Sequence, residues 1–273
     1  MPTKTITKIG NVEFDPDQLI IALKSLLELL PIDPSEISYL PAQKRKKIGE
    51  QIQLTIDKLL AIVRDLDPTK QPSYVLDPSD PQIVGRLISD TLVVQDRLSL
   101  DSIDKEKFYG SGVYAIYYNG DFDAYRPLLG SETPIYVGKV DPATAQASSP
   151  TEQGPKLHGR LKEHLKSVKS AENLNAGDFE CRFLVVKSAW QNTAETYLIN
   201  RYMPIWNNET SICFGIGKHG DSSETRKNAR SPWDTLHPGR KWAADSVPYR
   251  FSVDEIKTQI ASHFINFPPV GKI

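Results

Sequence analysis

An arginine and a histidine lie four positions apart in the segment HGRLKEH, residues 158–164, whose apolar spacing is typical of a helix. Residues four apart share one face of a helix, so Arg160 and His164 are expected to point the same way. A fixed guanidinium beside an imidazole that exchanges protons near neutral pH suits an anion whose charge grows during a reaction. The pair therefore predicts a site for chemistry on an anion.

Three strands and two helices are predicted around this pair. The β-branched and aromatic stretches GVYAIYY (112–118), PIYVGKV (134–140) and FECRFLVV (179–186) favour strands. The stretches 157–168 and 189–204 favour helices, the second ending before a proline. Short strands with two intervening helices predict a small α+β unit.

The first hundred residues follow a different pattern. Leu and Ile recur at helical spacing in segments 15–31, 41–68 and 77–100, which are separated by breaks that contain proline and serine. We therefore expect a helical N-terminal region at 1–105, for dimerisation or DNA contact, and a second domain at 106–273. The KRKK run at 44–47 fits either a phosphate contact or the solvated start of an amphipathic helix.

Composition limits the class of protein. The 273 residues carry a net charge of −1, which argues against a uniformly basic nucleic-acid binder. Basic residues still gather locally, with five Lys or Arg against one acidic residue in 156–169 and six against three in 218–241. Two cysteines give neither a disulfide scaffold nor a zinc motif. The N-terminus lacks a signal-peptide pattern and no segment is apolar enough to span a membrane, so we expect a cytoplasmic protein.

Five short motifs occur in an order that resembles the GIY-YIG nuclease superfamily. They are GVY at 112–114, YVG at 136–138, GR at 159–160, a helical Glu195 and a later Asn207. The resemblance covers about a hundred residues and implies the GIY-YIG fold: a small central antiparallel or mixed sheet flanked by helices, here with a helical N-terminal extension. Val113 and Val137 replace the family's isoleucines, and the loop between the tyrosine motifs is longer than the family minimum.

The segments GRLKEH and SPWDTLHPGRKWA further resemble type II restriction endonucleases that are SacII isoschizomers and read CCGCGG. This resemblance implies a Mg²⁺-dependent enzyme that hydrolyses double-stranded DNA at a short palindromic GC-rich site, with Mn²⁺ as a possible substitute. A palindromic target favours a homodimer. The alternatives are a GIY-YIG nuclease of DNA repair or homing, and a non-catalytic DNA-binding protein on this scaffold.

Phosphodiester hydrolysis assigns a role to each motif residue. Tyr114 is the candidate general base, although a phenol with a pKa of about 10 needs nearby cations or a proton-accepting imidazole such as His164. Arg160 suits two oxygens of the pentacovalent phosphate. Tyr136 is expected to orient the water or the phosphate.

The remaining assignments concern the metal and the fixed geometry. Glu195 is the expected Mg²⁺ ligand, since one carboxylate with several waters commonly holds this ion beside a phosphate. Lys139 adds charge, and Asn207 is expected to fix the geometry through its amide. Taken alone, each of these side chains would more often be a packing residue or a solvated surface residue than a catalytic one.

DNA specificity is assigned to the segment 211–242. Arg226, Arg230 and Arg240 are candidate DNA-binding residues, which would contact either guanines in the major groove or phosphates. His237 is interpreted as a DNA contact or a turn residue, and His158 as a surface residue. The tryptophans of this segment are equally consistent with a core.

Overall fold

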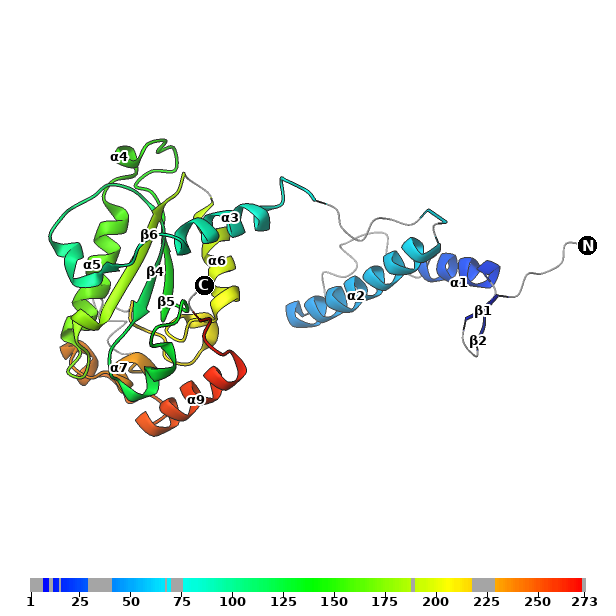
Figure 1. Ribbon diagram of the computed structural model, residues 1–273. Helices are drawn as coiled ribbons and strands as arrows, with labels where there is room; N and C mark the ends of the chain where they lie inside the picture. The colour runs from blue at the N-terminus through cyan, green and yellow to red at the C-terminus, as the bar shows by residue number, and fades with distance from the viewer. Residues whose placement is uncertain are drawn as a thin grey trace, which may run out of the picture. The chain divides into compact units, whose positions relative to one another are not determined.

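The computed structural model describes residues 7–9, 12–14, 16–28, 41–66, 68–69, 76–187, 190–217 and 229–271. The chain divides into two compact units, Met1–Leu76 and Asp77–Ile273 (Figure 1). The predicted DNA-binding residue Arg226 lies outside the described residues.

The first unit holds two short strands and two helices. Strand β1 (Thr7–Ile9) pairs with β2 (Val12–Phe14) in antiparallel fashion, and helices α1 (Pro16–Glu28) and α2 (Ala42–Leu66) follow. Both helices occur where the apolar spacing predicts them. Most of the described apolar side chains of α2 are exposed, from Ile48 at 38% to Val63 at 62%.

A four-stranded antiparallel sheet forms the centre of the second unit. Its order is β3 (Leu98–Ser99), β6 (Phe179–Val185), β4 (Gly112–Tyr118) and β5 (Tyr136–Val140). The three longer strands are those predicted from the sequence. All seven residues of β4 are buried, as expected for a central strand covered on both faces.

Helices cover both faces of this sheet. Alternate residues of β4 point to opposite faces, so Tyr114, Ile116 and Tyr118 join one core and Val113, Ala115 and Tyr117 join another. Helix α5 (Lys156–Ser170) packs into the first core through its leucines, and α6 (Gln191–Tyr202) packs into the second. Figure 1 shows the sheet between α5 on one side and α6 with α3 on the other.

Helix α3 (Pro81–Val93) belongs to this second unit. It begins with Asp80, whose carboxylate accepts the Gln82 N–H at 2.9 Å. It approaches α6 so closely that a Cβ on Gly85 would lie 2.9 Å from the Thr193 carbonyl oxygen. The compact units divide after Leu76, because α3 and β3 pack on the sheet and its helices. The domain boundary after residue 105 stays a prediction.

The C-terminal part adds short helices to the α5 face of the sheet. These are α7 (Pro232–Leu236), α8 (Lys241–Ala244) and α9 (Val253–Asn266), while α4 (Pro150–Gln153) precedes α5. Helix α9 begins with a capping box between Ser252 and Glu255. The predicted α+β class, an antiparallel sheet flanked by helices with further helices at the N-terminus, is confirmed. In the described residues, no helix is long and apolar enough to cross a membrane.

Candidate active site

The two motif tyrosines lie on neighbouring strands, and a glycine makes room for one of them. Tyr114 of β4 is opposite Gly138 of β5, and Tyr136 is opposite Ile116. A Cβ on Gly138 would lie 2.3 Å from the Tyr114 hydroxyl oxygen, so any larger residue would displace the ring. The ring centroids of Tyr114 and Tyr136 are 6.1 Å apart. The glycine of the YVG motif is thus needed for the phenol beside it.

His164 reaches the same point from α5. Its Nε2 lies 2.7 Å from the Tyr114 hydroxyl oxygen, and both side chains are 0% exposed. Leu161 and Leu165 hold this face of α5 against the sheet, which brings the imidazole 4.8 Å from the Tyr136 ring, centroid to centroid. A buried phenol and a buried imidazole therefore share one hydrogen bond.

Arg160 lies one helical turn before His164, at the edge of solvent. Its guanidinium forms hydrogen bonds with the hydroxyls of Tyr114 and Tyr136. Its Nη1 also lies 2.6 Å from a carboxylate oxygen of Glu163, and its side chain is 28% exposed. The expected placement of Arg160 and His164 on one side of α5 thus brings both to the tyrosines.

Burial decides the protonation state of the tyrosines. Burial raises the pKa of Tyr114 well above the ordinary value of 10.0, and the Tyr136 hydroxyl adds to this while Arg160 lowers it by less. Burial also raises the pKa of Tyr136, against a lowering by Arg160. Both groups are therefore neutral phenols in the free protein. The expectation that neighbouring cations favour the Tyr114 phenolate does not hold for this state.

Glu195 of α6 provides the carboxylate of the site. Burial raises its pKa, the charge of Lys139 and a hydrogen bond from the Lys139 main chain oppose the shift, and Glu209 adds to it. The Lys139 ammonium also pairs with Asp141 at 2.8 Å. The Glu195 carboxylate is thus half-buried, and the nearby positive charge does not fully offset the effect of burial on its pKa.

Asn207 ties the segment after α6 to strand β5. Its Oδ1 accepts the Val137 N–H and its Nδ2 donates to the Val137 carbonyl, both at 2.9 Å, and the residue is 4% exposed. Val137 sits between Tyr136 and Gly138, so the amide fixes the strand at the tyrosine motif. Its contact is with the main chain of β5.

These residues surround a cleft of about 270 Å³. Four of the predicted residues line it: Tyr136, Arg160, Glu195 and Asn207. Tyr114 and His164 lie beneath it, joined to its wall through Tyr136 and Arg160. The arrangement offers a carboxylate, a guanidinium and a hydroxyl to a small anion, with a proton acceptor behind them.

Comparison with family models gives a match to the Eco29kI GIY-YIG domain over residues 106–264. This interval covers more than half of the 273 residues and contains every motif that lines the cleft. The chain belongs to the Eco29kI GIY-YIG domain family. The match supports a nuclease of the restriction type. Comparison with curated proteins finds no match.

The donor set of this GIY-YIG site fits a single-carboxylate metal centre. No group of three or more His, Cys, Asp or Glu residues that could hold a metal occurs among the described residues. Magnesium commonly takes one or two carboxylates and completes its shell with water and phosphate oxygens. A carboxylate whose pKa is raised by burial gains from a nearby cation, so Glu195 fits such an ion. Glu209, which also lines the cleft, was missed by sequence reasoning.

Two of the candidate DNA-binding arginines, Arg230 and Arg240, have mainly structural contacts in the free protein. Arg230 donates to the carbonyls of Ala243 and Ala244 at 3.0 and 2.9 Å, at the end of α8. Arg240 is 7% exposed, and its donors bond to Asp234 and to main-chain carbonyls. DNA contact by these residues stays a prediction.

The histidines assigned to the surface or to DNA are buried. His158 is 6% exposed and packs edge-on against Phe108 at 5.4 Å, so its surface assignment is wrong. His237 is 0% exposed, with Nε2 2.6 Å from the Tyr125 hydroxyl and Nδ1 2.9 Å from Asn173 Oδ1. Of the two tryptophans in segment 211–242, Trp233 is in the core at 0% exposed, and Trp242 is partly exposed.

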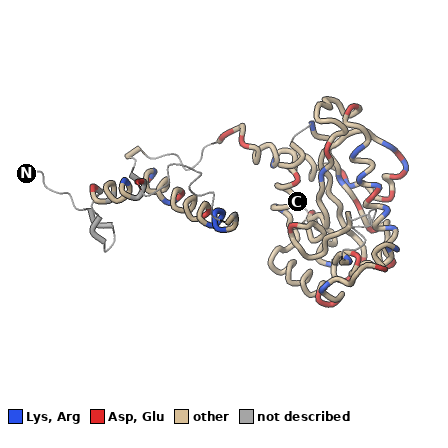
Figure 2. The backbone as a smooth tube through the Cα atoms, turned by 180° about the vertical axis from the view of Figure 1, so that it is seen from behind, with Lys and Arg blue, Asp and Glu red and all other residues tan. Residues whose placement is uncertain are grey.

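Acidic partners moderate the basic segment of α5. Lys162 pairs with Asp104 at 2.9 Å and Lys169 pairs with Asp101 at 2.6 Å. Figure 2 shows basic and acidic residues close together along this side of the second unit. The local positive charge predicted from the sequence is therefore partly neutralised before any anion binds.

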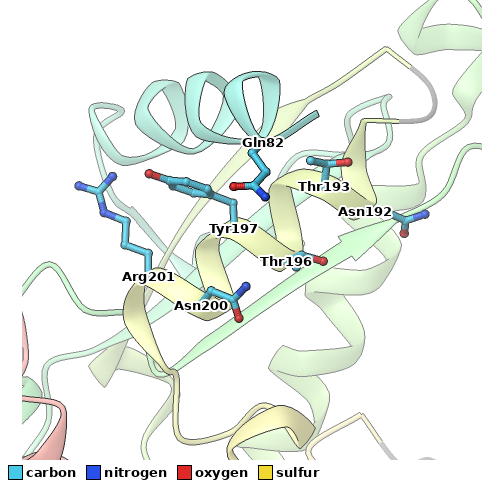
Figure 3. A pocket seen from close by; sticks show the side chains of 7 residues that line it. All are labelled: Gln82, Asn192, Thr193, Thr196, Tyr197, Asn200 and Arg201. Carbon is cyan, nitrogen blue, oxygen red and sulfur yellow. The ribbon is translucent and has the colours of Figure 1, made fainter. Parts of the chain in front are cut away.

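A larger hollow of about 620 Å³ lies between α3 and α6 (Figure 3). It is lined by Gln82 of α3 and by residues of α6: Asn192, Thr193, Thr196, Tyr197, Asn200 and Arg201. It contains none of the motif residues, and Arg201 is paired with Asp90 at 2.8 Å. The larger of the two hollows therefore lacks the residues expected for catalysis, and the smaller polar cleft is the candidate active site.

Proposed function

We propose that this protein is a Mg²⁺-dependent type II restriction endonuclease that hydrolyses double-stranded DNA at a short palindromic GC-rich site, with CCGCGG as the first sequence to test. The observation that carries the proposal is the hydrogen bond between the Tyr114 hydroxyl and His164, set behind a cleft lined by Arg160 and Glu195. Proton acceptor, charge stabiliser and metal ligand thereby meet at one place.

Attack on the phosphate requires a water molecule to lose a proton as its oxygen bonds to phosphorus. Tyr114 is 0% exposed, so a water in the cleft reaches it through Tyr136, whose ring centroid lies 6.1 Å from that of Tyr114 and whose hydroxyl acts on the pKa of Tyr114. The water gives its proton to Tyr136, Tyr136 passes its own to Tyr114, and Tyr114 passes its own to His164 Nε2. The net result is a hydroxide equivalent and an imidazolium, with both phenols restored.

Arg160 compensates the charge that develops on the phosphate oxygens. Its guanidinium already lies at the cleft and is oriented by the tyrosine hydroxyls and by Glu163. A positioned donor of this kind typically contributes about 3–4 kcal/mol to the chemical step. Glu195 would hold a magnesium ion, or a manganese ion in its place, which supplies Lewis-acid stabilisation of the phosphate and of the leaving 3′-oxygen.

A palindromic target requires two cuts related by a two-fold axis, so we propose a homodimer in which each copy cuts one strand. The exposed apolar side chains of α2 support a role for this helix in dimerisation. Sedimentation equilibrium of the full chain and of a variant with Ile52→Glu and Val63→Glu measures this directly. A wild-type monomer at micromolar concentration with DNA bound contradicts the homodimer.

The test of function is digestion of a plasmid library with and without Mg²⁺, followed by sequencing of the ends. We expect double-strand breaks at one palindrome, only when the metal is present. The Glu195→Ala variant serves as the control for contaminating nucleases. No cleavage of any DNA with Mg²⁺ or Mn²⁺ overturns the proposal, and cleavage at another palindrome overturns only the CCGCGG assignment.

A further inference from the structure

One wall of the active-site cleft consists of main chain. Gly215, Ile216 and Gly217 line it, and a Cβ on Gly217 would lie 2.8 Å from Nη2 of Arg160. Gly215 has a φ of +115°, and a Cβ there would lie 2.3 Å from the Ser231 Cβ. The loop 215–217 therefore lies between Arg160 and the start of α7: a side chain at Gly215 would clash with Ser231, and one at Gly217 would displace the Arg160 guanidinium.

Arg240 holds this loop from behind. Its Nη2 donates to the Gly215 carbonyl and its Nη1 to the Ile216 carbonyl, both at 2.9 Å. Its Nε donates to Asp234 at 2.6 Å. The guanidinium carbon lies 4.5 Å from the centre of the Trp233 ring. One side chain thus fixes two consecutive carbonyls of the cleft wall.

The counter-charge of Arg240 is itself held rigidly. Asp234 is 2% exposed, and its second carboxylate oxygen accepts the Ser231 hydroxyl at 2.6 Å. Ser231 is the N-cap of α7, where its hydroxyl oxygen also accepts the Asp234 N–H. Both oxygens of the buried Asp234 carboxylate thus accept hydrogen bonds, one of them from its charged partner Arg240. The carboxylate keeps one geometry, because any movement would leave the buried charge unpaired.

Helix α5 holds the loop from the other side. The Ser167 hydroxyl donates to the Ile216 carbonyl at 3.2 Å, and Ser167 follows Arg160 by two helical turns. Residues seven apart lie on nearly the same face of a helix. The same helix therefore carries the guanidinium that faces the cleft and an anchor of the loop beside that guanidinium.

We propose that Arg240 is a positioning residue of the active site: by fixing loop 215–217 it sets the place of Arg160 at the phosphate. Its catalytic consequence rests on the nuclease function proposed above. Lysine keeps the charge but lacks the planar fork that serves two carbonyls and a carboxylate together. Arg240→Lys should therefore loosen the loop while preserving the buried ion pair.

The control variant is Arg182→Lys. Arg182 is 8% exposed, pairs with Glu132 at 2.6 Å and donates to the Gln95 carbonyl at 2.6 Å, so it is a buried arginine with a comparable set of partners. It lies on β6 and does not line the cleft. An effect of general destabilisation would appear in both variants, and an effect on the cleft would appear only in Arg240→Lys.

The first measurement is hydrogen exchange of the peptide spanning residues 212–217 in the full chain, followed by mass spectrometry. We expect faster exchange there in Arg240→Lys and no change in Arg182→Lys. Unchanged exchange in Arg240→Lys overturns the proposal. Hydrogen exchange does not depend on cleavage. An inactive wild-type protein would therefore count against the proposed nuclease function, while the exchange rates would still test whether Arg240 positions the loop.

The second measurement is the single-turnover cleavage rate at saturating DNA. We expect Arg240→Lys to lose about tenfold or more in rate with DNA affinity changed by less than about threefold, since small misplacements affect the chemical step most. In an Arg160→Lys background the same substitution should cost little, because the group it positions is already altered. An equal loss in both backgrounds overturns the proposal.

A third variant covers the case in which Arg240→Lys fails to fold. Ser167→Ala removes the α5 anchor of the Ile216 carbonyl and leaves the buried ion pair intact. We expect faster exchange in 212–217 and a rate loss of about twofold to fivefold, since one neutral hydrogen bond is removed. Wild-type exchange and rate in this variant would overturn the role of the loop.

Discussion

Acidification tests the hydrogen bonds of the buried residue His237. The Asn173 amide donates through its Nδ2 to the Leu236 carbonyl at 2.9 Å, so its Oδ1 must accept, and His237 Nδ1 carries the proton. The Tyr125 hydroxyl then donates to Nε2 at 2.6 Å and accepts from Trp206 Nε1 at 2.9 Å. Every polar atom of the imidazole is used in its neutral form.

Burial lowers the pKa of His237 from 6.5 to about 3 in the folded protein. Below pH 6.5 the unfolded chain therefore takes up a proton that the folded chain refuses, and stability falls as the pH falls. At about 1.4 kcal/mol per pH unit the loss is about 2 kcal/mol at pH 5 and approaches about 5 kcal/mol near pH 3.

The assay is urea unfolding between pH 8 and pH 4, followed by tryptophan fluorescence. The four tryptophans, at 190, 206, 233 and 242, all lie in the second unit, so the signal reports its unfolding alone. His237→Gln keeps an acceptor for Tyr125 and removes the titration. We expect this variant to be less stable at pH 8 but to lose about 2 kcal/mol less than the wild type on going to pH 5. Parallel pH dependences in the two proteins would refute the buried neutral histidine.

Three further predictions concern the cleft. Glu195→Ala should abolish cleavage while DNA affinity, measured by fluorescence anisotropy, stays nearly unchanged; full activity would overturn the metal-ligand assignment. Tyr114→Phe removes only a hydroxyl, so its thermal midpoint should stay near the wild-type value while cleavage is lost, and normal cutting would make Tyr114 a packing residue. Arg160→Ala should slow single-turnover cleavage by about 10²–10³. His164→Ala should give a rate that climbs about tenfold per pH unit up to pH 10, because the pKa of Tyr114 lies well above 10.0 and its ionised fraction grows throughout that range; a profile parallel to the wild type would exclude the proton relay.

The motif glycines and helix α5 show what the sequence could predict. The four-residue spacing placed Arg160 and His164 on one face of a helix, and the structure shows Leu161 and Leu165 holding that helix against the sheet. The order of the motifs then indicated which strands pair, because a resemblance to a known fold implies the register of that fold's strands. The glycine at 138 follows from the same register.

Contacts between distant segments were not predictable in this way. The division between the compact units depends on Gly85 lying against Thr193, a contact across more than a hundred residues. His158 was misassigned because its burial depends on Phe108, from a segment without regular periodicity. The fork of Arg240 meets carbonyls 24 and 25 residues before it. The charge and the usual exposure of a residue type therefore do not predict its contacts where those contacts depend on tertiary packing.

The burial of Tyr114 also determines which residue the reaction depends on. A phenol in this environment ionises only at a pH far above neutrality, so Tyr114 cannot store a negative charge between turnovers. It can still transmit a proton, because gaining one from Tyr136 while losing one to His164 keeps it neutral throughout. The acceptor at the end of this relay is then the imidazole of His164, whose Nε2 lies 2.7 Å from the Tyr114 hydroxyl oxygen. Burial would disable a tyrosine that acts as a base alone, but it is compatible with a tyrosine that transmits a proton. The proposed mechanism therefore depends on His164 as the final proton acceptor.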